Sequence, residues 1–171
     1  MKQVALISMG LLFFAATALA EDYASPQRRE NVQKLRQELV PYATDQALEE
    51  FSKTVHGGVM HVVAKSANDA NQIRLIQDYL RQTAEAFGNG DFSSTEKMHG
   101  ADMPGLQQLK TAKTDDIRFE YKTLPNGAQI HFSTEYPQFV QALHEWLDAQ
   151  IKDHGNALEP EHLKHHSGMA E

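Results

Sequence analysis

The stretch from Ile117 to Thr134, IRFEYKTLPNGAQIHFST, gives the clearest indication of the fold. Phe119 and Tyr121 alternate with polar residues, and Ile130 and Phe132 do the same after a Pro-Asn-Gly sequence. Apolar residues at every second position on both sides of such a sequence predict two strands joined by a tight turn. We therefore expect a β-hairpin with one buried face.

A second hairpin is predicted from Lys53 to Ala64. Thr54-Val55 and the run from Val59 to Val63 are rich in β-branched residues, which favour strands. Gly57-Gly58 lies between them and suits a tight turn. This stretch repeats the plan of the first in a weaker form.

An amphipathic helix is predicted after each hairpin, from Asp69 to Phe87 and from Pro137 to His154. A glycine follows each helix, as is common just past a helix C-terminus. Apolar residues recur at helical spacing in both: Ile73, Ile76, Leu80 and Phe87 in the first, and Val140, Leu143, Leu147 and Ile151 in the second.

The two hairpin–helix units align as an internal duplication. When the glycines that follow the helices are matched, Phe87 corresponds to His154, and His61 lies three residues out of register with His131. A loop can absorb a shift of that size. We predict an α+β fold, with a duplicated ββα–ββα unit that forms a four-stranded antiparallel sheet with helices on one face. Convergence on a common small plan is the alternative to duplication.

Residues 1–20 have the pattern of a secretory signal peptide. Lys2 gives a basic start, Val4 to Ala16 is almost wholly apolar, and Ala18-Leu19-Ala20 supplies the small residues of a cleavage site. The apolar run is too short for a comfortable membrane span. We expect a periplasmic or secreted protein without stable membrane insertion.

The remaining chain divides into three predicted segments: an N-terminal helical segment over 21–52, an α+β domain over 53–155 and a flexible His-rich tail over 156–171. In the first segment, Ser25-Pro26 begins a helix that ends before Pro41. Thr44-Asp45 can cap a second short helix. Its apolar residues are Ala47, Leu48 and Phe51.

Charge and composition exclude several classes of function. There are 16 Lys and Arg residues against 23 Asp and Glu residues, and the basic residues do not cluster, so we expect no nucleic-acid binding. The absence of cysteine excludes thiol catalysis, haem attachment through Cys and Cys-zinc sites. The sequence also lacks the motifs of serine hydrolases, phosphate-binding loops, zinc proteases and dinucleotide-binding folds.

A long segment over 89–114 joins the two units and contains the best candidate ligands. Met98, His99, Asp102 and Met103 lie close together among glycines that allow tight turns. Thioether and imidazole together suit copper, so we expect a metal site for copper first and zinc second. In the alternative, both methionines fill the core and the polar pair makes turn hydrogen bonds.

The last helix adds a second candidate pair, because His144 and Asp148 are four residues apart and therefore neighbours on one face. The alternative is a structural role at the edge of the apolar stripe. Further histidines are weaker candidates: His61, His131, His154, and in the tail His162, His165 and His166.

The strand histidines can be assigned to a face by parity. His61 and His131 alternate with inward apolar residues, so both are expected on the sheet face away from the helices. Val59 and Val63 share that face. Such a surface suits a homodimer contact or an envelope protein partner.

Several stretches carry a resemblance to a known family: 57–59 with 62–65, 90–92, 99–106, 142–150 and 153–155. They resemble a family of small exported proteobacterial proteins of unknown function, sometimes labelled aspartate carbamoyltransferase. The resemblance implies a shared fold and draws attention to His99, Asp102, Met103, His144, Asp148 and His154. It does not imply that enzyme, because the Ser-Thr-Arg-Thr phosphate loop of carbamoyltransferases is missing and the chain is too short for their two domains.

We therefore expect a periplasmic metal-binding protein that buffers, delivers or senses copper or zinc. The competing hypothesis is a non-enzymatic protein-interaction module that uses the open sheet face or the 89–114 segment. A third, weaker possibility is an enzyme of unrecognised type that uses His99, Asp102 and His144.

Overall fold

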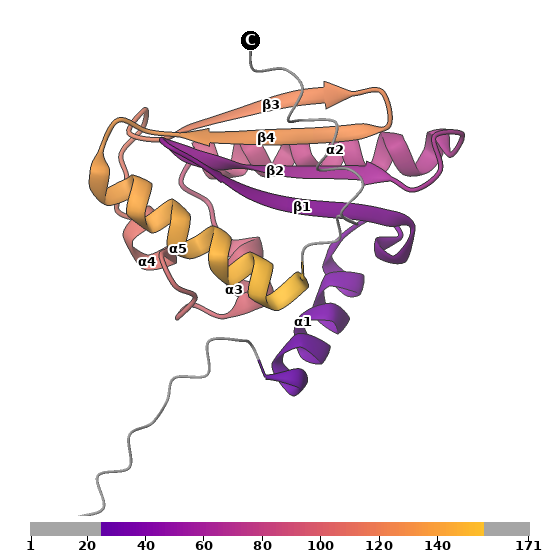
Figure 1. Ribbon diagram of the computed structural model, residues 1–171, viewed down its shortest axis with the longest axis horizontal. Coiled ribbons are helices and arrows are strands. Elements are labelled where there is room, and N and C mark those ends of the chain that lie inside the picture. Colours follow the sequence, from indigo (N-terminus) through magenta and orange to yellow (C-terminus); the bar gives the residue numbers. More distant parts are fainter. Residues whose placement is uncertain (1–24, 156–171) are drawn as a thin grey trace, which may run out of the picture.

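Four antiparallel strands form one sheet in the order β1-β2-β4-β3, and the helices pack on one of its faces (Figure 1). The computed structural model describes residues 25–155. The strands are β1 (Ala47–Thr54), β2 (Gly57–Ala64), β3 (Arg118–Leu124) and β4 (Gly127–Ser133). The helices are α1 (Pro26–Leu39), the short 3₁₀ helix η1 (Thr44–Gln46), α2 (Ala70–Gly88), α3 (Ser93–His99), α4 (Leu106–Leu109) and α5 (Pro137–His154). The predicted α+β fold is confirmed.

Local sequence signals set the helix ends. The Ser25 hydroxyl accepts a hydrogen bond from the backbone N–H of Arg28 at the start of α1, and the Asp69 carboxylate accepts one from the N–H of Gln72 at the start of α2. Gly155 follows α5 with a φ of 76°, which favours glycine.

The two hairpin–helix units correspond closely. Glu50 pairs with His61 in the first hairpin, and 70 residues later Glu120 pairs with His131 in the second. The helices of the two units correspond with a shift of 67 residues. The connection between hairpin and helix is therefore three residues shorter in the second unit. Each helix crosses to the other hairpin, because α2 packs mainly on β3 and β4 whereas α5 packs on β1 and β2.

The predicted second short helix is wrong beyond its first turn. η1 ends at Gln46, and Ala47 to Thr54 is the edge strand β1. Ala47, Glu49 and Phe51 face inward, so the alternation is present but a charged residue stands in the middle of it. Glu49 is tolerated there because Arg36 of α1 pairs with it at 2.7 Å.

The first hairpin turns at Val55-His56, and the two glycines lie inside β2 rather than in the turn. A Cβ at Gly57 would lie 2.2 Å from the carbonyl oxygen of Phe132, and one at Gly58 would lie 2.3 Å from a methyl group of Leu147. These glycines allow α5 and β4 to approach β2 closely.

The sheet has a buried face and an open face. Met60, Val62, Ile130 and Phe132 are buried beneath the helices. The alternate residues of β2 and β4 are only partly buried, as parity predicts for His61 and His131. No helix within residues 25–155 combines the length and apolar character that a membrane crossing requires.

Candidate functional site

The ligands predicted in the 89–114 segment separate in the structure. Met98 and Met103 are buried, as the core-filling alternative predicts, whereas Asp102 is exposed. His99 is the last residue of α3 and only 4% exposed, so it does not face solvent. Met103 and Asp102 are therefore not brought to His99, whereas its neighbour Met98 lines the same cavity as His99.

The predicted helix pair lies elsewhere, on the side of α5 that faces β1. The ring Nε2 of His144 is 2.9 Å from the carbonyl oxygen of Thr54, and Asp148 forms a surface ion pair with Lys53 at 2.7 Å. Both side chains thus have structural partners. They do not join the loop ligands in one site.

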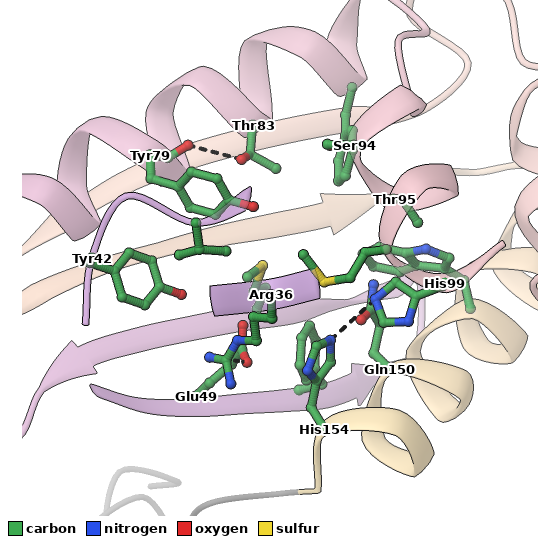
Figure 2. A pocket seen from close by; sticks show the side chains of 16 residues that line it. Arg36, Tyr42, Glu49, Tyr79, Thr83, Ser94, Thr95, His99, Gln150 and His154 are labelled. Carbon is green, nitrogen blue, oxygen red and sulfur yellow. Dashed lines mark hydrogen bonds and ion pairs between the residues drawn. The ribbon is translucent and has the colours of Figure 1, made fainter. Parts of the chain in front are cut away.

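A different cluster forms where the ends of α3 and α5 meet. The Nε2 atoms of His99 and His154 are 3.2 Å apart, with the rings nearly perpendicular at 83°. Figure 2 shows the two rings directed toward each other from the two helices. The Nδ1 of His99 lies 2.7 Å from a carboxylate oxygen of Asp153. His154, a weaker candidate in the sequence, is therefore the partner of His99.

Arg28 of α1 completes this cluster. Its guanidinium donates to both carboxylate oxygens of Asp153 at 2.8 and 2.9 Å, and to the carbonyl oxygen of His99 at 3.0 Å. Three helices that are distant in sequence are thus joined around one buried carboxylate. We refer to Arg28, His99, Asp153 and His154 as the helix-end cluster.

Glycines allow the chain to reach this arrangement. Gly100 ends α3 with a φ of 91°, which turns the chain immediately after His99. Gly105 has a φ of 76°, and a Cβ there would lie 2.1 Å from the carbonyl oxygen of Ala142 in α5. Only glycine permits this close approach of the loop to α5.

The electrostatics of the cluster keep Asp153 charged and His154 neutral. Burial acts to raise the pKa of Asp153, but hydrogen bonds from His99 and Arg28 outweigh it and lower the pKa to about 2. Burial lowers the pKa of His154 to about 3, and the neighbouring His99 and Arg36 add to this effect. At neutral pH the His154 imidazole therefore has a free nitrogen lone pair.

A small cavity of about 40 Å³ adjoins the cluster, lined by Met98, His99 and His154 on one side and by the Arg36–Glu49 ion pair on another. The Nδ1 of His154 is buried and has no hydrogen-bond partner within residues 25–155. The cavity has room for about three water molecules, which is too little for an organic substrate.

The strand histidines form separate pairs on the open sheet face. His61 lies 3.7 Å from Glu50, and His131 lies 4.0 Å from Glu120. Neither pair approaches the helix-end cluster.

Across residues 25–155 no group of three or more His, Asp or Glu side chains could hold a metal ion. The tail histidines His162, His165 and His166 and the predicted signal peptide lie outside the described residues.

Sequence reasoning missed Asp153 and Arg28. The only sequence signal for Asp153 is weak: it is an acidic residue next to a histidine in the last turn of a predicted helix. No local sequence pattern marks Arg28, because its partner Asp153 lies 125 residues away.

A scan of protein-family models, a search of curated proteins and a search of solved structures each found no match to this chain.

Proposed function

We propose that this protein binds a single Cu(I) ion between His99 and His154, with Met98 as the third ligand, and that it buffers or delivers copper in the periplasm. The observation that carries the proposal is the 3.2 Å separation of the two Nε2 atoms. Two nitrogen ligands that are 2.0–2.1 Å from a three-coordinate ion lie about 3.5–3.6 Å from each other. The pair therefore needs little movement to accept an ion.

The surroundings of the pair support metal binding. Asp153 accepts the Nδ1 proton of His99, which directs the Nε2 of this ring away from the carboxylate and toward His154. The proton that His154 carries between the rings can move to its Nδ1, which is buried and has no hydrogen-bond partner within residues 25–155. Both Nε2 atoms can then bind an ion together.

Charge and ligand type favour Cu(I) over Zn²⁺. The cost of burying an ion rises with the square of its charge, and the two imidazoles and the thioether are all neutral. Zn²⁺ also prefers four ligands, usually with thiolate or carboxylate among them. Met98 lines the same cavity as both histidines and offers a soft ligand that suits Cu(I).

The proposal is tested by anaerobic Cu(I) titration in competition with a chromophoric chelator. All proteins carry His162, His165 and His166 changed to Gln in an otherwise full chain, so that the tail contributes no imidazole. The parent should bind one equivalent with sub-micromolar affinity. Free Cu(I) at 100 times its Kd should stabilise the fold by about 2.7 kcal/mol.

His154→Phe is the decisive variant, because phenylalanine already occupies the corresponding position, Phe87, in the other unit. It should abolish tight binding without unfolding the protein. Met98→Leu should weaken binding by at least about tenfold while preserving volume. His131→Gln removes a surface imidazole and should change nothing. Equal binding by the parent and His154→Phe would exclude the site.

A further inference from the structure

Two hollows of the structure meet at the proposed site. The inner one is the small cavity described above, and the outer one is a groove of about 410 Å³ between α1 and α3. Met98 and His99 line both. The other residues of the groove are Ser25, Gln27, Arg28, Asn31, Val32 and Leu35.

The residues that separate the two hollows are therefore two of the three proposed ligands. An ion in the groove meets Met98 and His99 before it meets His154, which lines only the inner cavity. A thioether binds Cu(I) without a proton to displace, so it can take up the ion first. A third hollow lies beside α2 and β3 and also adjoins the inner cavity. The residue that it shares with the cavity is Phe87, whose side chain offers no ligand atom.

We infer that the groove between α1 and α3 is the route by which Cu(I) enters and leaves the site. The inference rests on the proposed function. Met98 passes the ion inward to the His99–His154 pair, and the same residue lies at the exit when a partner removes the ion.

The position of α1 sets the width of this route. Arg28 holds the start of α1 to Asp153 and to the carbonyl oxygen of His99, at the edge of the groove. Val32 is buried farther along the same helix. The exposed Asn31 lies between these two anchors and lines the groove, so a larger side chain there would fill the route without touching a proposed ligand.

The test compares Asn31→Trp with Gln33→Trp, another exposed position of α1 that does not line the groove. Stopped-flow mixing with Cu(I) measures uptake, mixing with excess chelator measures release, and chelator competition measures Kd. Asn31→Trp should slow uptake and release by about tenfold each and leave Kd unchanged. Gln33→Trp should match the parent.

Gln27→Trp, on the same groove, provides a second blocking variant should Asn31→Trp fail to fold. Unchanged rates in a folded blocking variant with intact affinity would overturn the route and leave the site standing. Absence of Cu(I) binding by the parent would overturn both the site and the route. A loss of affinity with unchanged association would also overturn the route, because it would mean that the tryptophan disturbs the ligands instead.

Discussion

Helices α2 and α5 end at corresponding places in the two units, but the two ends differ in chemistry. Phe87 at the end of α2 stacks on Phe92 at 4.9 Å and contacts Phe119 and Trp146 edge-on. His154 at the end of α5 stacks on Phe51 at 6.0 Å and turns its Nε2 to His99. The first end is an aromatic cluster, and the second is the helix-end cluster.

The polar cluster is therefore not a feature that the two helix ends share. The same helix end is closed by aromatic packing in one unit, with Ala86 at the position that Asp153 occupies in the other. A buried carboxylate and two imidazoles carry a desolvation cost that the aromatic end avoids. The proposed binding of Cu(I) at the α5 end would account for this cost.

Where the units agree, matched substitutions should have equal effects. Leu80 and Leu147 correspond, and both are fully buried against the sheet. Leu80→Ala and Leu147→Ala should each lower the free energy of unfolding by about 3 kcal/mol, because each leaves a cavity in the core. Urea unfolding followed by circular dichroism measures both. A difference greater than about 1.5 kcal/mol would break the proposed correspondence.

Where the units differ, Asp153→Ala makes the α5 end resemble the α2 end at one position. We expect a loss of about 2 kcal/mol at pH 7, since His99 and Arg28 lose their shared acceptor. The pKa of Asp153 falls from 3.8 to about 2 on folding, so its contribution is present above pH 4 and disappears as the pH falls to 2. The parent and the variant should therefore converge in unfolding experiments toward pH 2. A constant difference across that window would contradict the assignment.

The pH dependence of stability should also differ between the parent and His154→Phe, which carries the aromatic residue of the α2 end. The folded pKa of His154 is lowered from 6.5 to about 3, so the unfolded chain takes up a proton that the folded chain does not. The parent should therefore lose stability as the pH falls below 6.5, by about 2 kcal/mol between pH 7 and pH 5. The variant should lose less over this range and be at least as stable at pH 5. Parallel profiles from thermal unfolding would show that His154 is not buried in its neutral form.

The fold was largely predictable because its signals are local. Alternation in 117–134, helical spacing in α2 and α5, and the glycines after both helices identify most elements without any knowledge of tertiary contacts. β1 was not predicted because Glu49 interrupts its apolar alternation. The ion pair with Arg36, which allows this charge to be buried, is formed only in the folded protein. The same limit applies to the site. His99 stood out by its neighbours in sequence, but its partners on α1 and α5 are brought to it by folding alone.

The smallest expected effect concerns the exposed faces of α2 and α5, which both carry surface ion pairs. Asp148 of α5 corresponds to Arg81 of α2, and both make ion pairs at the surface. Asp148→Asn should change the free energy of unfolding by less than about 0.5 kcal/mol, because water and salt screen its attraction to Lys53. It should also leave Cu(I) affinity unchanged, measured by the same chelator competition. A lowered affinity would move the site toward His144 and Asp148, and the contrast between the two helix ends would then lose its functional meaning.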